Sequence, residues 1–141
     1  MKKILIHIVS VCSIIQICYG QIKPLKVFTT ENLWRSVPTK DGHGFKFTET
    51  VKAKDKYVFA FYEDHITLKS TKLITLKIIK INDPHNSEGG YTVKDSNNNY
   101  FIIVLHEGVI DNEPYYEIDF FKTTQSGKLL TLTKFECKKI P

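Results

Sequence analysis

Short apolar segments alternate with clusters of turn residues along most of the chain. The segments are rich in Val, Ile, Thr, Phe and Tyr, which suit a pleated strand, and no ten-residue window carries a helical stripe. The breaks between them carry Gly, Pro, Asn, Asp or Ser, which form tight turns. The pattern predicts these strands: Lys26–Thr29, Phe45–Lys52, Lys56–Tyr62, Ile66–Lys69, Leu73–Ile81, Tyr91–Lys94, Tyr100–His106, Tyr115–Lys122 and Lys128–Cys137.

The connections between these segments are short, and short connections join neighbouring strands antiparallel. We therefore expect an all-β fold with little helix, an antiparallel meander of about eight strands that forms a closed or nearly closed barrel. One region is ambiguous. Glu31–Arg35, after the possible caps Thr29 and Thr30, fits either a helical turn or a bulged strand start.

Alternation within the strands indicates which side chains point inward. Tyr57, Phe59 and Phe61 share one face of their strand, and Val58 and Ala60 share the other. A second strand places Tyr116, Ile118 and Phe120 on one face and Glu117 and Asp119 on the other. The aromatic faces are expected to fill the barrel or line a cavity.

Two strands, Leu73–Ile81 and Tyr100–Leu105, are apolar on both faces. Their outer faces need a cover, for which the sequence leaves two explanations. A terminal segment, the stretch around Trp34 or a neighbouring sheet could pack there. Alternatively, these faces form a surface for a protein partner or a homodimer.

The first twenty residues have the pattern of a cleavable signal peptide. Lys2 and Lys3 precede the apolar run from Ile4 to Ile17, which is shorter than the ~20 residues that span a bilayer and ends near the small Gly20. We predict a signal peptide at 1–20, a single β domain at 21–141 and no transmembrane segment after cleavage. The protein is expected to be secreted or periplasmic. The absence of an Asn-x-Ser/Thr sequon favours a bacterial source.

Cleavage would also remove Cys12 and Cys18, so that Cys137 remains without an intrachain partner. The domain must then be stabilised by its hydrophobic core. Cys137 is expected to be a packed or partly exposed thiol, with intermolecular pairing as the alternative.

Charge argues against a nucleic-acid partner. Loss of Lys2 and Lys3 leaves 20 − 2 = 18 basic and 15 acidic residues, a formal net charge of +3. Only Arg35 is an arginine, the side chain that recognises phosphates and bases best, and the lysines are scattered.

No metal site is expected from the residue spacing. His43, His65, His85 and His106 lack the close spacing that puts two ligands on one ion. Asp95–Asn99 resembles the start of a calcium loop, but Tyr100 replaces the required glycine and His106 the bidentate glutamate, so an Asx-rich turn is preferred. A second loop could gather Asp83, His85 and Glu88 around an ion, although its proline and glycines are ordinary for a loop.

Catalytic patterns are weak as well. No Gly-x-Ser-x-Gly elbow and no phosphate-binding glycine loop occur. Cys137 could pair with a histidine only in principle. Glu117 and Asp119 could act as paired carboxylates, but a solvated face beside lysines explains them better. We predict no catalytic residue and no cofactor.

The arrangement resembles the lipocalin-like, or calycin, group of small secreted barrels. The similarity rests on Trp34 near the start, the strand with Phe45 and Phe47, the Tyr57–Phe61 strand that leads through Glu63 and Asp64, and the closing strand from Leu129 to Lys134. The group typically has Gly-x-Trp, whereas Asn32 stands two residues before Trp34. It often packs a late arginine on that tryptophan, whereas the last strand here offers Lys134. The resemblance implies a small secreted barrel and supports ligand binding, although the group includes binding proteins, enzymes and envelope proteins.

These observations favour an exported, non-catalytic protein that binds a small apolar or amphipathic ligand in the barrel mouth. The expected ligand-binding residues are Tyr57, Phe59, Phe61, Tyr116 and Phe120. The first alternative is an interaction module of the cell envelope that uses an apolar sheet face, and the second is an enzyme of unknown type.

Overall fold

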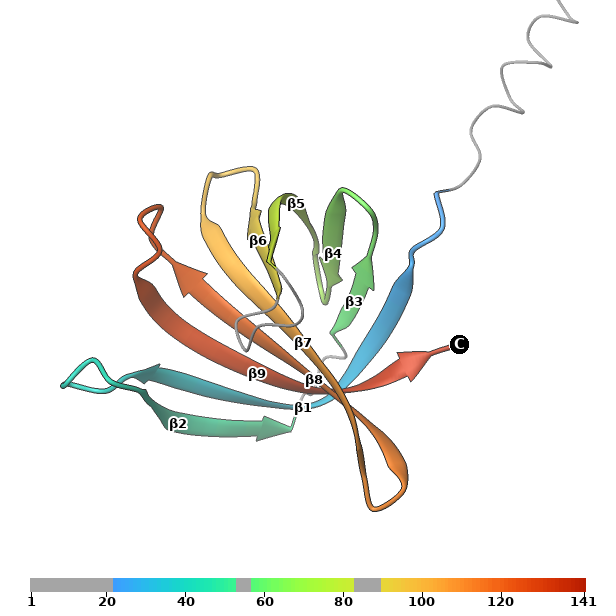
Figure 1. The fold of residues 1–141 in the computed structure, drawn as a ribbon, viewed down its shortest axis with the longest axis horizontal. Helices are drawn as coiled ribbons and strands as arrows, with labels where there is room; N and C mark the ends of the chain where they lie inside the picture. The colour runs from blue at the N-terminus through green and yellow to red at the C-terminus, as the bar shows by residue number, and fades with distance from the viewer. Residues whose placement is uncertain (1–21, 53–56, 83–89) are drawn as a thin grey trace, which may run out of the picture.

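A single antiparallel sheet closes on itself in the structure, a computed structural model that describes residues 22–52, 57–82 and 90–141. The strand order is β2-β1-β3-β4-β5-β6-β7-β8-β9, and β1 also pairs with β9 (Figure 1). An eight-stranded barrel therefore results, with β2 as an extra strand, and the predicted fold class is confirmed. The strands are β1 (Lys26–Pro38), β2 (Phe45–Lys52), β3 (Val58–Phe61), β4 (His65–Lys69), β5 (Leu73–Asn82), β6 (Gly90–Lys94), β7 (Tyr100–Ile110), β8 (Glu113–Thr123) and β9 (Leu129–Ile140).

Strand β1 pairs with three other strands. Its first residues, Lys26 to Thr29, pair with β3, and the same edge then pairs with β2 from Asn32 onwards. Its other edge pairs with β9, with a bulge between Thr30 and Asn32 that leaves Glu31 unpaired. The predicted helical turn at Glu31–Arg35 is therefore wrong, and the alternative of a bulged strand is confirmed.

The hairpin between β7 and β8 is longer than predicted. Asp111 and Asn112 have φ angles of 51° and 66°, as expected for a two-residue type I′ turn. The strands consequently continue to Ile110 and restart at Glu113, and the tip extends beyond the barrel, at the bottom of Figure 1. Residues that the sequence assigned to a loop thus belong to the ladder.

Inward-pointing side chains of all eight barrel strands form one hydrophobic core. Aromatic rings contact one another across it, as in Phe28 with Phe61 at 5.7 Å between ring centroids and Phe59 with Phe135 at 5.0 Å. Burying each such side chain contributes about 1.5–3 kcal/mol to folding, and each ring pair adds about 0.5–1.5 kcal/mol. Cys137 is a free, buried cysteine in this core, which agrees with the packed thiol.

Strands β5 and β7, which were expected to be apolar on both faces, differ in how far other residues cover their outer faces. On β7 the outward Ile102 is half-buried and lies beside Phe121, whose ring approaches that of Phe45 on β2 at 5.8 Å. The extra strand β2 therefore helps to cover this face, which is a cover other than those that the sequence suggested. On β5, Leu73 and Ile79 are exposed.

Among the described residues no helix is long and apolar enough to cross a bilayer.

A close backbone approach explains one glycine of the sheet. A Cβ on Gly90 would overlap the carbonyl oxygen of Ile103 on β7, which is backbone and cannot turn aside, whereas a Cβ on Gly108 would meet no atom within 4 Å. We expect Gly90→Ala to lower the free energy of unfolding by about 1–3 kcal/mol. Gly108→Ala, the matched control, should change it by no more than ~0.5 kcal/mol. Urea denaturation measures both, and equal effects would contradict this interpretation.

Candidate functional site

The five aromatic residues predicted to bind a ligand all lie on the inner side of the barrel, but they differ in burial. Phe59 and Phe61 are completely enclosed by the core, with exposed fractions of 0% and 2%. Tyr57, Tyr116 and Phe120 pack against that core and keep part of their surface exposed. These three are the predicted residues that solvent, and hence a ligand, can reach.

The three reachable residues divide between the two ends of the barrel. We call the end where β3 and β7 begin and β8 finishes the Tyr57 end, and the opposite end the Tyr116 end. At the Tyr57 end, the ring of Phe120 lies 4.9 Å from that of Phe101, and the ring of Tyr57 lies 5.5 Å from that of Phe135. At this end, half-buried aromatic side chains therefore lie directly above the buried aromatic core.

An ion pair spans the Tyr116 end. Lys26 Nζ on β1 donates to Glu107 Oε1 on β7 at 2.9 Å, although β8 and β9 separate these strands in the sheet. Strand alternation relative to the buried Phe28 and Ile103 directs both side chains inward. Tyr116 lies beside them, opposite Glu107 in the register, with its ring 5.4 Å from that of Phe28. This end is therefore crossed by side chains.

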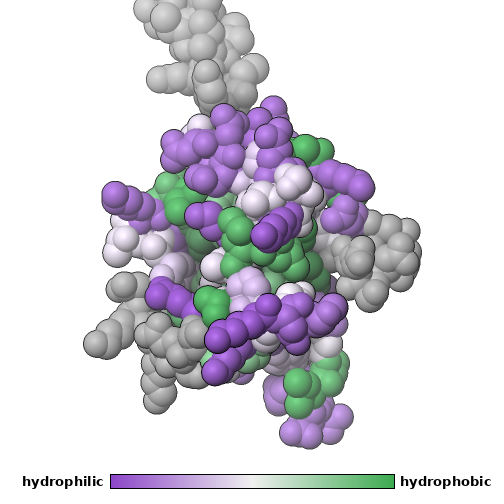
Figure 2. Space-filling view, turned by 90° about the vertical axis from the view of Figure 1, so that its left-hand side faces the viewer, coloured by the Kyte–Doolittle hydropathy of each residue, from purple (hydrophilic) through white to green (hydrophobic). Residues whose placement is uncertain are grey.

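Polar groups flank the apolar surface at the Tyr57 end. A pocket of about 540 Å³ lies there between the β6–β7 and β8–β9 turns and is lined in part by Asn99, Lys122 and Thr124. Lys122 is paired with Phe101 in the register, so the backbone of this lysine lies beside that of a half-buried aromatic residue. Figure 2 faces the side of these turns and shows hydrophobic surface near its centre with hydrophilic residues around it.

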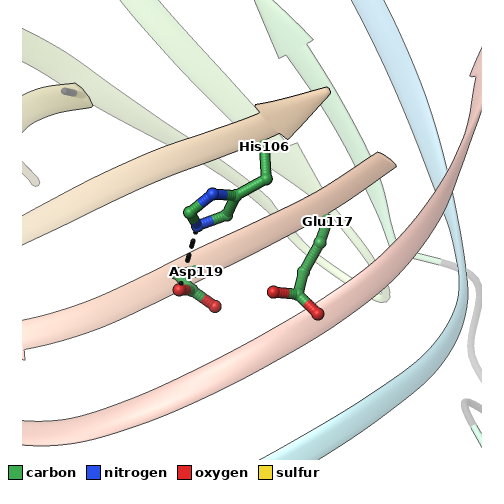
Figure 3. A group of neighbouring side chains, drawn as sticks. All are labelled: His106, Glu117 and Asp119. Atoms are coloured by element: carbon green, nitrogen blue, oxygen red, sulfur yellow. Dashed lines mark hydrogen bonds and ion pairs between the residues drawn. The ribbon is translucent and has the colours of Figure 1, made fainter. Parts of the chain in front are cut away.

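A second candidate site lies on the outer face of the barrel, where β7, β8 and β9 run side by side. His106, Glu117 and Asp119 point toward one another there (Figure 3). His106 pairs with Glu117 across the β7–β8 ladder, and Asp119 follows two residues later on the same face. His106 Nε2 lies 3.1 Å from Asp119 Oδ2.

Lys134 and Tyr115 complete this outer cluster. Lys134 on β9 pairs with Asp119 in the register, and its Nζ donates to Glu117 Oε1 at 2.6 Å and lies 3.5 Å from Asp119 Oδ1. Tyr115 Oη donates to Glu117 Oε2 at 2.6 Å. Lys134 also lies opposite Trp34 on β1 in the register.

The cluster changes the acidity of its members. Burial by itself would raise the pKa of Glu117, but hydrogen bonds from Lys134 and Tyr115 outweigh it and hold that pKa below its ordinary value. Burial would likewise lower the pKa of Lys134, yet the carboxylates of Glu117 and Asp119 raise it. Burial and the hydrogen bond to Glu117 raise the pKa of Tyr115. Glu117 and Lys134 are therefore an ion pair at neutral pH.

The expectation of a solvated carboxylate face is wrong for Asp119, which is only 8% exposed. Its Oδ1 atom is buried and accepts no hydrogen bond from the described residues. Sequence reasoning missed the cluster because it ended one strand at His106 and began the next only at Tyr115. A two-residue turn at Asp111 and Asn112 would have paired His106 with Glu117.

The remaining candidate residues have local roles. The carboxylate of Asp95 accepts backbone N–H groups from Asn97 and Asn99, so the Asx-rich turn is confirmed. His43 is exposed in the β1–β2 connection, and His65 stacks on Tyr62. The candidate ligands Asp83, His85 and Glu88 lie outside the described residues. Burial raises the pKa of Cys137 to about 12, which keeps the thiol protonated and opposes a nucleophilic role.

Comparison with known proteins yields no relative. No protein-family model matches the chain, and neither a curated protein nor a solved structure matches it. The barrel is consistent with a lipocalin-like fold in strand number and antiparallel order. The function of this chain must therefore be inferred from its own residues.

The ion pair of Glu117 predicts a pH effect on stability. Because folding lowers the pKa of this carboxyl, its contribution is complete above the unfolded pKa of about 4.3 and is lost as pH falls through the lower, folded value. We expect Glu117→Gln to lower the free energy of unfolding by about 1–3 kcal/mol at pH 7. The deficit relative to the unmodified protein should shrink between pH 5 and pH 3, as measured by urea denaturation across that range.

Glu113→Gln on the same strand is the matched control, because Glu113 is exposed. Its effect on the free energy of unfolding should stay within ~0.5 kcal/mol at each pH. A Glu117→Gln deficit that is the same at every pH would contradict the ion pair as its cause.

Proposed function

We propose that this protein is a non-catalytic binding protein that holds a small apolar or amphipathic ligand at the Tyr57 end of its barrel. The observation that carries the proposal is the half-buried aromatic surface of Tyr57, Phe101 and Phe120 above a buried aromatic core. Such surface gains free energy when it is covered, at about 25 cal/mol per Å² of apolar area. The other end is crossed by the Lys26–Glu107 pair, which favours entry at the Tyr57 end.

The neighbouring polar groups favour an amphipathic ligand over a purely apolar one. An apolar part would cover the rings of Phe101 and Phe120, and a polar or anionic head would reach Lys122, which is paired with Phe101. The pocket between the two turns supplies amide and hydroxyl groups beside that ammonium. This division into an apolar body and a few polar anchors is typical of small-molecule sites.

The setting of this activity is part of the proposal. The signal-like residues 1–20 support export, and the protein would act in a periplasmic or extracellular space, in a bacterium. The lipocalin-like resemblance of the chain supports a carrier role, and the eight-stranded barrel is compatible with it.

Two tyrosines that flank β3 provide a matched test. Tyr57 precedes the strand at the Tyr57 end, Tyr62 follows it at the other end, and both are half-buried. With the fluorescent fatty acid cis-parinaric acid as probe, Tyr57→Ser should raise the dissociation constant about tenfold or more, equivalent to ~1.4 kcal/mol. Tyr62→Ser should change it less than about twofold.

Absence of saturable binding, or an equal effect of both substitutions, would overturn the assignment. Native mass spectrometry of the protein from its own host would identify the natural ligand. A lipid or another amphiphile that co-purifies with the barrel would support the proposal, and a ligand-free spectrum with failed probe binding would oppose it.

A second candidate function is a protein-interaction module of the cell envelope. Leu73 and Ile79 on β5 are 64% and 48% exposed, so these apolar side chains of the strand are available for contact with a partner. Size-exclusion chromatography with light scattering tests the homodimer form of this alternative. A protein that stays monomeric at high concentration would remove the homodimer.

A further inference from the structure

The outer cluster has the donor set of a transition-metal site. One imidazole nitrogen of His106 and one carboxylate oxygen each of Glu117 and Asp119 lie within 4.8 Å of one another (Figure 3). The three residues come from two directly paired strands, so the ladder fixes the positions of their Cα atoms. Small side-chain rotations would bring the three atoms to the ~2.0–2.2 Å that zinc requires of nitrogen and carboxylate ligands.

The burial of Asp119 is a second observation that favours a bound cation. The side chain of Asp119 is 12% exposed, and its Oδ1 atom accepts no hydrogen bond from the described residues, whereas Oδ2 contacts His106. The Lys134 ammonium forms an ion pair with this Oδ1 oxygen at 3.5 Å, but it donates its hydrogen bond to Glu117. A buried carboxylate oxygen that accepts no hydrogen bond is unfavourable relative to the same oxygen in water. An ion bound between the three side chains would remove that cost.

Charge supports the same conclusion. Glu117 and Asp119 carry two negative charges, and Lys134 supplies one positive charge. With a neutral imidazole at His106, the form that binds metals, the four side chains together retain one negative charge. Exchange of the ammonium for a divalent ion would fully neutralise the two carboxylates.

We propose that His106, Glu117 and Asp119 bind one divalent transition-metal ion and that Zn²⁺ is the ion that suits them best. Imidazole and carboxylate together fit zinc, whereas calcium and magnesium prefer oxygen-only shells of six or more ligands. Three protein ligands leave a position for water or a further ligand, as in open zinc sites. The site lies on the outer face of the barrel and is independent of the ligand proposed for its interior.

Lys134 competes with the metal in this arrangement. Its ammonium donates to Glu117 Oε1 at 2.6 Å and therefore occupies part of the space that the ion needs. The side chain is 27% exposed, so its long stem can carry the ammonium into solvent when the ion binds. Metal affinity should thus be limited by this internal cation, and its removal should increase the affinity.

Isothermal titration of the purified protein with ZnCl₂ tests the proposal. We expect one site per chain with a dissociation constant of ~10 µM or lower. His106→Gln should weaken binding at least ~10-fold, because it removes the nitrogen ligand from a half-exposed position that the core does not need. His43→Gln, which changes an exposed histidine in the β1–β2 connection, should leave the affinity within about twofold.

Lys134→Met gives the most discriminating result. The substitution keeps the apolar stem and removes the ammonium, and we expect it to tighten zinc binding about tenfold. Cobalt serves as a spectroscopic probe, because Co²⁺ bound by His106 should show a visible absorption band that His106→Gln abolishes. Circular dichroism confirms that each variant is folded.

Other outcomes would overturn the site. One such outcome is that neither the unmodified protein nor Lys134→Met shows saturable zinc binding. Another is that His106→Gln does not weaken binding, or that His43→Gln weakens it as much as His106→Gln does. A Lys134→Met protein that binds zinc more weakly than the unmodified protein would equally refute the competition. None of these results bears on cis-parinaric acid binding, so the two proposals fail separately.

Discussion

The pairing of β1 with β9 is the constraint on which the rest of the structure depends. These two strands lie at opposite ends of the chain order, and their ladder from Val27 to Ser36 turns an open meander into a barrel. Closure removes the unpaired strand edges at this seam and encloses Phe28, Phe135 and Cys137. The only cysteine among the described residues is a free thiol, so here hydrogen bonds and packing hold the seam without a disulfide.

The bulge at Glu31 determines which face of β1 the later residues occupy. Phe28 and Thr30 point inward before it, and strict alternation would continue with Asn32 and Trp34. The unpaired Glu31 shifts this alternation by one residue, so Leu33 enters the core and Asn32 turns outward, where its amide donates to Glu136. Trp34 is thereby placed on the outer face, opposite Lys134. The extra residue in β1 thus keeps Leu33 in the apolar interior and places Asn32 on the outer face beside β9.

Much of this barrel could be predicted because its turns and alternation are encoded locally. The inward positions of Tyr57, Phe59 and Phe61 follow from period-two patterning alone, since that pattern depends only on neighbouring residues. The bulge at Glu31 could not be predicted in the same way, because it depends on the register with a strand about a hundred residues away. Register between distant strands is a property of the closed sheet.

The outer cluster could be predicted from the sequence only in part. His106 and Glu117 are each five residues from the turn, since 111 − 5 = 106 and 112 + 5 = 117, so the hairpin alone pairs them. Pro114 and Gly108 obscured this hairpin in the sequence, because both residues weaken a strand assignment. Lys134 enters the cluster only through the pairing of β8 with β9, which the hairpin does not determine.

Strand β8 carries both candidate sites on opposite faces, and this arrangement gives the outer cluster a mechanical consequence. The Lys134 ammonium ties β8 to β9 through Glu117 and Asp119. An ion held by His106 and the same two carboxylates would instead tie β8 to β7, because His106 lies on β7. Exchange of the ammonium for the ion would therefore remove the link to β9 and strengthen the link to β7 that His106 and Asp119 already form. Phe120 follows Asp119 directly and faces the barrel interior, so the two candidate sites share β8 but lie on its opposite faces.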